Sequence, residues 1–156
     1  MLIGDRESGL GSPMADKSGV DVNVKQVIVI RKDLKMRRGK EIAQGSHASV
    51  KFLSDRIRKV TNHRVPSMAG EHFPVFLSDV EEAWIMGSFA KICLRVESEE
   101  ALLALHEKAQ EAGLVSSLIQ DAGRTEFHGV PTYTCLAIGP DEAEKIDVIT
   151  GDLKLY

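Results

Sequence analysis

The sequence has few of the residues that mark several large classes of protein. Its 156 residues include only two cysteines, Cys93 and Cys135, too few for the disulfide framework of a small secreted protein. Both cysteines lie in apolar runs, so we expect reduced thiols in the core; a disulfide or a reactive site is the alternative. No uninterrupted apolar run approaches the ~18 residues that a membrane span needs, which predicts a protein without a membrane partner.

The beginning of the sequence also lacks the apolar stretch of a secretory signal. Residues 1–23 mix Gly, Ser, Asp and Lys without periodicity, and we expect a flexible tail there. The remaining residues, 24–156, have the length of one domain with a single core. Together with reduced cysteines, these features favour a cytoplasmic protein.

Sequence motifs of metal and cofactor enzymes are missing as well. The five histidines show no spacing that would gather metal ligands with a cysteine or carboxylate. Gly39-Lys40 lacks the earlier glycine that a phosphate-binding P-loop requires, and neither G-x-G-x-x-G nor G-x-S-x-G occurs. We therefore expect no metal, no nucleotide cofactor and no covalent nucleophile.

Positive charge is concentrated in one segment, although the whole chain has a net charge of −3. Residues 31–64 contain eleven Lys or Arg and three Asp or Glu, a balance of +8, whereas the rest of the chain contains nine basic and twenty acidic residues, a balance of −11. Such a basic region can attract a polyanion while the acidic remainder repels non-specific contact. A solvated helix face is the alternative explanation of the same charges.

Hydrophobic patterns and chain breakers predict one α/β domain with a mixed sheet of roughly four strands packed by helices. The expected order is β-α-flap-β-α-β-β-α, without an internal repeat. Segment 61–87 is expected to be an inserted flap, with a short helix opened by Ser78 or Asp79. We expect strands over 25–31, 89–96, 114–120 and 132–138, and the other helices from Lys40, Ser98 and Pro140.

The first helix, expected from Lys40, has two different faces at a period of 3.6 residues. The face expected to pack on the sheet carries Ile42, Ala43, Ser46, Val50, Leu53 and Ile57. The opposite face carries Lys40, Gln44, His47, Lys51 and Arg58.

Two polar clusters are candidates for chemistry. Lys40, Gln44 and His47 are spaced i, i+4, i+7, which places an ammonium, an amide and an imidazole within roughly 60° of arc. The positive charge of Lys40 is unfavourable at the start of a helix, which indicates a role other than helix stability. A solvated polar face is the alternative explanation.

The second cluster is residues 120–125, which place a carboxylate, a glycine turn, a guanidinium and a hydroxyl at a strand end. An Asx turn capped by Asp121 is the alternative explanation of this cluster.

Several blocks of the sequence resemble the type-2 peptidyl-tRNA hydrolases, a family of archaea and eukaryotes that also occurs in some bacteria. The likeness covers about residues 24–156 in unchanged order. The matching blocks are VIRKDLKM (29–36), GK (39–40), AQ (43–44), SHA (46–48), LIQDAGRT (118–125), AIGP (137–140) and TGDLKLY (150–156).

The resemblance implies an α/β fold, a homodimer, no cofactor, and hydrolysis of the ester that joins a peptide to the terminal ribose of tRNA. Position by position, the family's catalytic group corresponds to Lys40, His47, Asp121 and Thr125. The residues expected beside the site are Gln44, Gln120, Ala122, Gly123 and Arg124. Those expected to hold the tRNA backbone are Arg37, Arg38, Lys51, Arg58 and Lys59.

For this reaction, Asp121 is expected to orient water. The Thr125 hydroxyl and the backbone N–H groups of Ala122-Gly123 are expected to stabilise the oxyanion by hydrogen bonds. Lys40 is expected to supply positive charge to the oxyanion or a terminal phosphate, and His47 to shuttle a proton or anchor the helix. The competing hypothesis is a tRNA-binding or protein-interaction module that keeps the fold without catalysis.

Overall fold

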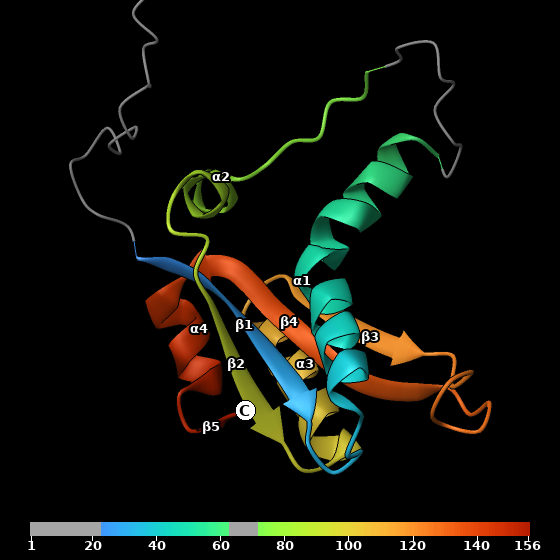
Figure 1. The fold of residues 1–156 in the computed structure, drawn as a ribbon. Helices are drawn as coiled ribbons and strands as arrows, with labels where there is room; N and C mark the ends of the chain where they lie inside the picture. Colours follow the sequence, from blue (N-terminus) through green and yellow to red (C-terminus); the bar gives the residue numbers. More distant parts are fainter. Residues whose placement is uncertain (1–22, 63–71) are drawn as a thin grey trace, which may run out of the picture.

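The computed structural model describes residues 23–62 and 72–156. The predicted tail up to residue 22, and residues 63–71 of the predicted flap, lie outside this range. Figure 1 shows the elements, which are β1 (Val24–Arg31), α1 (Arg38–Val60), α2 (Asp79–Met86), β2 (Lys91–Val96), α3 (Glu99–Glu111), β3 (Ser116–Asp121), β4 (Thr132–Glu142), α4 (Ala143–Thr150) and β5 (Lys154–Leu155).

One mixed sheet organises these elements, with five strands in the order β3-β4-β1-β2-β5. β1 and β2 are parallel, and the other neighbouring pairs are antiparallel. The predicted α/β class is confirmed. The sheet has one strand more than expected, because Lys154 and Leu155 pair with β2.

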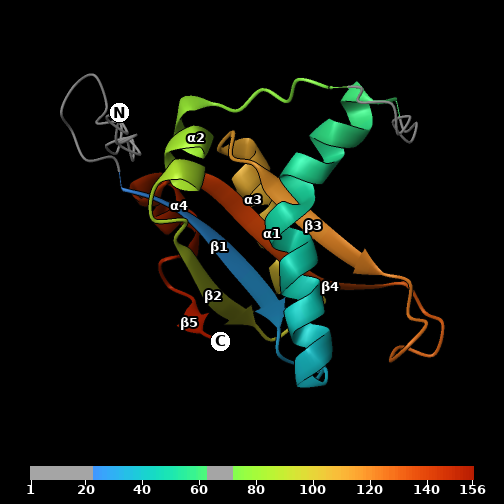
Figure 2. The same cartoon turned by 45° about the horizontal axis from the view of Figure 1, so that its top comes forward.

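Helices cover both faces of the sheet, with α1 and α2 on one face and α3 and α4 on the other (Figure 2). Neighbouring residues of a strand point to opposite faces, so β1 contributes to both layers. Val27 and Val29 join the cluster that includes Leu102 of α3, whereas Ile28 joins the cluster that includes Ala48 of α1. A third cluster packs Trp84 of α2 against Phe52 of α1 and Val24.

The face of α1 that contacts the sheet is not the predicted one. Its buried residues are Gln44, Gly45, Ala48 and Phe52. The predicted inner stripe is instead largely exposed, at 64% for Ile42, 51% for Val50 and 47% for Ile57. The physical reason is that a face of small residues packs on the sheet here: a Cβ at Gly45 would be in ordinary van der Waals contact with Ile28, and Ala48 joins the same core cluster as Ile28.

Two predicted helix starts are confirmed by their caps. Ser78 opens α2 through a capping box with Glu81. At the start of α3, the Ser98 hydroxyl accepts a hydrogen bond from the backbone N–H of Ala101 at 3.1 Å. The short helix in segment 61–87 packs on the body of the protein through Trp84, which is 1% exposed.

The helix start predicted at Pro140 is wrong. β4 continues to Glu142, and α4 begins at Ala143. Pro140 is buried where the register between β4 and β1 shifts, so its missing N–H falls at a strand irregularity, where proline is tolerated.

Only one of the two cysteines is a core thiol as predicted. Both are free, but Cys135 is buried and Cys93 is exposed. The cause is the position of α1, which packs on β1, β3 and β4 and leaves that side of β2 open.

Candidate active site

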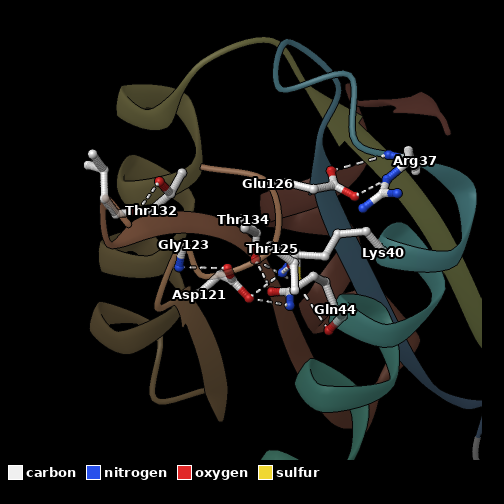
Figure 3. A network of polar contacts seen from close by, with 11 residues as sticks. Arg37, Lys40, Gln44, Asp121, Gly123, Thr125, Glu126, Thr132 and Thr134 are labelled. Carbon is white, nitrogen blue, oxygen red and sulfur yellow. Dashed lines mark hydrogen bonds and ion pairs between the residues drawn. The ribbon is translucent and has the colours of Figure 1, made fainter. Parts of the chain in front are cut away.

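The start of α1 and the end of β3 meet at one end of the sheet. β1 and β3 both run antiparallel to β4, so their C-terminal ends lie at the same edge, and α1 follows β1 after a short connection. Lys40 Nζ lies 2.5 Å from Asp121 Oδ2 and 3.1 Å from Thr125 Oγ1. Figure 3 shows these side chains pointing toward one another. The structure thus brings together three of the four residues predicted to be catalytic.

The Asp121 carboxylate accepts hydrogen bonds on both oxygens. Oδ2 accepts from Lys40 Nζ and, at 3.0 Å, from Gln44 Nε2, and Oδ1 accepts from the Gly123 N–H at 2.8 Å. Burial alone would raise the pKa of Asp121, but the hydrogen bonds from Lys40, Gly123 and Gln44 outweigh burial and hold this pKa below its ordinary value. The carboxylate is therefore ionised at neutral pH.

The turn after β3 requires glycine at position 123. Gly123 has a φ of +77°, and an added Cβ would lie 2.4 Å from the carbonyl oxygen of Val130. Because its N–H donates to Asp121 Oδ1, the Asx turn considered as an alternative exists together with the site. The same contact corrects the expectation that the Gly123 N–H stabilises the oxyanion, because this N–H already donates to Asp121 Oδ1.

Gln44 joins the site to the core. Its side chain was predicted to face solvent, but the residue is 3% exposed. Its Nε2 donates to Asp121, and its Oε1 accepts a hydrogen bond from the hydroxyl of the fully buried Thr134 at 2.5 Å. Thr134 was not identified from the sequence, because it lies 90 positions from Gln44 and no local spacing connects them.

The other predicted site residues lie outside this set of contacts. His47 is exposed and makes no hydrogen bond or ion pair with another residue of 23–62 or 72–156. Lys51 forms an ion pair with Asp55 at 2.5 Å. The remaining exposed residues of the predicted set are Arg37, Arg38, Arg58, Lys59, Gln120, Ala122 and Arg124.

An open pocket of about 400 Å³ lies beside the contacts of Lys40. Arg37, Gly39, Lys40, Thr125 and Glu126 line it. Two of these lining residues are hydrogen-bonded to each other, since Arg37 Nε donates to Glu126 Oε1 at 2.8 Å. Glu126 was not singled out from the sequence, because a single carboxylate in an irregular loop fits no spacing rule.

The chemical groups of the site are an ammonium, a carboxylate, an amide and a hydroxyl. Within residues 23–62 and 72–156, no cluster of three His, Cys, Asp or Glu side chains is arranged to hold a metal ion. In the same ranges, every helix is too short or too polar to cross a membrane.

Comparison with known proteins identifies the family. The sequence model of the family described as Peptidyl-tRNA hydrolase PTH2 matches residues 24–156. The chain belongs to the peptidyl-tRNA hydrolase PTH2 family. Membership in the PTH2 family confirms the resemblance seen in the blocks around Lys40 and Asp121.

Relatives from archaea and a mammal align over most of this PTH2-family chain. Peptidyl-tRNA hydrolase of Methanothermobacter thermautotrophicus is 39% identical over 136 residues, covering 85% of the chain and 99% of the relative. The Methanopyrus kandleri protein of the same name is 43% identical over 132 residues, covering 84% and 97%. Peptidyl-tRNA hydrolase 2, mitochondrial, of Mus musculus is 37% identical over 152 residues, covering 97% and 72%.

Proposed function

We propose that this protein hydrolyses the ester bond between peptide and tRNA in peptidyl-tRNA and so returns the tRNA to translation. The observation that carries the proposal is that Asp121 and Thr125 both contact Lys40, and that Lys40 and Thr125 line one open pocket. The names of the PTH2 relatives support the same substrate. Ester hydrolysis needs a group that orients water and donors that stabilise the oxyanion, and these side chains supply both.

Asp121 is the group that orients water. Each carboxylate oxygen has two lone pairs, and Oδ2 already accepts from Lys40 and Gln44. Oδ1 accepts only from the Gly123 N–H among the described residues, so one lone pair is left for a water molecule. Because its pKa is depressed, Asp121 is a weak base, and its role is to hold and orient the water rather than to remove a proton before attack.

Lys40 and Thr125 are the donors for the developing negative charge. When the water oxygen bonds to the ester carbon, the carbonyl oxygen becomes an oxyanion, which the ammonium and the hydroxyl can stabilise. Collapse then breaks the bond to the ribose oxygen, and this oxygen takes up the proton that the water loses. The products are a peptide carboxylate, a tRNA with a free terminal hydroxyl, and the second proton of the water, which passes to solvent. His47, seven residues after Lys40, is kept as a candidate shuttle for the proton that the ribose oxygen takes up.

One side of α1 provides a path for the tRNA backbone. At 100° per residue, Lys40, His47, Lys51 and Arg58 lie on one line along the helix, which extends over roughly 27 Å at a rise of 1.5 Å per residue. Arg38 lies at the beginning of the same helix and is exposed. Contacts of these groups with phosphates would be independent of base sequence and sensitive to salt.

The decisive experiment measures peptide release from a purified N-blocked aminoacyl-tRNA, with and without a chelator. We predict turnover by the wild-type protein in both conditions. Asp121→Ala and Lys40→Ala should each lower kcat about 100- to 1,000-fold, the range seen when one group that orients or stabilises a transition state is removed. A wild-type protein that binds tRNA but releases no peptide would contradict the proposed reaction, and wild-type turnover by either variant would remove that residue from the mechanism.

We also infer a homodimer. The outer face of α1 carries four exposed apolar residues, Ile42, Val50, Ile57 and Val60, and several large apolar side chains exposed on one helix face favour an interface. A second copy of the same face is a self-complementary partner for it under two-fold symmetry. Light scattering of the purified protein tests this inference.

For the compartment, we propose the cytoplasm, on the basis of the free cysteines. The mouse relative is named mitochondrial, so organelle import is the competing outcome. Imaging of the tagged protein in its own cells distinguishes the two locations.

A further inference from the structure

α1 begins without a capping side chain of its own. Its N-cap residue is Arg37, whose side chain makes no capping hydrogen bond, whereas Ser78 and Ser98 cap α2 and α3. The first N–H groups of a helix have no partner within the helix, and this end carries a partial positive charge. The same first turn carries Lys40, so the placement of this helix end decides the geometry of the site.

Glu126 supplies a carboxylate to this helix end from the opposite side of the pocket. Its Oε1 accepts from Arg37 Nε at 2.8 Å, and its Oε2 accepts from the Arg37 backbone N–H at 3.4 Å (Figure 3). The side chain of Glu126 is 14% exposed and that of Arg37 is 78% exposed, so the guanidinium lies on the solvent side of the pair. The hydrogen bond from Arg37 holds the pKa of Glu126 below its ordinary value, which keeps the carboxylate charged at neutral pH.

The pair fastens the loop after β3 to α1 beside the reacting groups. Glu126 directly follows Thr125, whose hydroxyl lies 3.1 Å from Lys40 Nζ. On the other side of Glu126, the ring of Phe127 packs against the core cluster under α1 and lies 5.6 Å from Lys40 Nζ. The loop is thus held at two neighbouring points, one polar and one apolar.

We propose that Glu126 is a positioning residue, which holds Arg37 and thereby keeps the Thr125 hydroxyl against the Lys40 ammonium. The proposal rests on the peptidyl-tRNA hydrolysis proposed for this site. A carboxylate at the wall of a pocket for an anionic substrate also repels that substrate. Glu126 is therefore expected to raise kcat and to raise KM, two effects that a residue needed only for folding would not combine.

The test compares Glu126→Ala and Glu126→Gln in the full chain, with N-blocked aminoacyl-tRNA as substrate. The alanine variant should lose about 10- to 100-fold in kcat, the usual effect of a small misplacement of reacting groups, while KM falls about two- to fivefold because one negative charge is gone. The glutamine variant keeps an oxygen that can accept from Arg37. It should recover most of kcat and keep the low KM.

The matched control is Glu144→Ala, which removes the same charge from an exposed position of α4 and should change neither constant. If Glu126→Ala does not fold, Glu126→Asp replaces it, because the shorter side chain keeps the charge but not the reach. A lower kcat with unchanged KM is then expected. An alanine or aspartate variant with wild-type kcat, or a loss of kcat that glutamine does not restore, overturns the positioning role. A wild-type protein without turnover would contradict the proposed reaction instead.

Discussion

Gln44 is a buried amide with both ends engaged, and this arrangement controls the charge of the site. Its Nε2 donates to Asp121, and its Oε1 accepts from Thr134, so neither polar group is left without a partner. A glutamate at this position would place a second negative charge beside Asp121 in a largely buried site. A like charge disfavours the ionised form of a carboxyl, so the pKa of Asp121 would rise from its depressed value.

We predict that Gln44→Glu moves the acid limb of the pH profile of kcat to higher pH, by about one unit or more. In the wild type, the pKa of Asp121 lies below its ordinary value of 3.8, so more than half of this carboxyl is ionised at pH 4 and its loss of charge falls toward lower pH. The measurement is kcat from about pH 4 to pH 8. Gln110→Glu, the same change at an exposed position of α3, should leave the profile unchanged. An active Gln44→Glu variant with the wild-type acid limb would contradict the assigned role of Asp121.

At the scale of single residues, the sequence predicted the groups that lie at the ends of elements better than those that support them. Lys40, Asp121 and Thr125 stand at junctions, where side chains of adjacent strands and helices converge, and their meeting was predicted. The supporting contacts of Thr134 and Glu126 join segments about 90 residues apart. Such contacts depend on the tertiary fold, and nothing in the neighbouring sequence indicates them.

Among the elements, α1 carries apolar residues on its outer side as well as its inner side. The period of 3.6 residues identified the outer stripe as the core face, because Gly45, Ala48 and a buried amide contribute little to a hydrophobic period. The actual inner face combines small residues in van der Waals contact with β1 and an amide whose two ends are hydrogen-bonded within the protein. The position of β1 and the starts of α2 and α3 agreed better with the sequence, since the apolar, β-branched run of β1 and the caps of the two helices are local signals.

The outer stripe of α1 gives a prediction about assembly. We expect a dimer in the wild type and a shift toward monomer in Ile57→Glu, because an unpaired carboxylate in an apolar interface costs several kcal/mol. Light scattering at increasing protein concentration measures the change. Val148→Glu makes the same substitution on α4, on the opposite side of the sheet, where the valine is 87% exposed, and should remain dimeric. A monomeric wild type, or equal behaviour of the two variants, would contradict an interface at α1.

Over the whole molecule, the positive charge that the sequence concentrates in one segment is partly neutralised by ion pairs within the fold. Within the described residues, the basic segment comprises the last residue of β1, the connection after it, and α1 with the two residues that follow. Several of its charges are paired, among them Arg31 with Asp33, Lys51 with Asp55 and Arg56 with the buried Glu81. The positive field available to a tRNA is therefore smaller than the formal charge of the segment suggests, and it depends on which side of α1 faces the substrate.

The side of α1 that continues from Lys40 should act on substrate binding alone. We predict that Lys51→Glu raises KM about three- to tenfold at low salt and leaves kcat unchanged, because a phosphate contact is replaced by a repulsive charge. The dependence of log KM on log salt should also become shallower, by roughly 0.7 to 0.9 for one lost contact. Lys108→Glu alters the net charge equally but lies on α3, across the sheet from α1. If the two variants raise KM to the same extent, the tRNA responds to the total charge of the protein, and α1 does not provide its path.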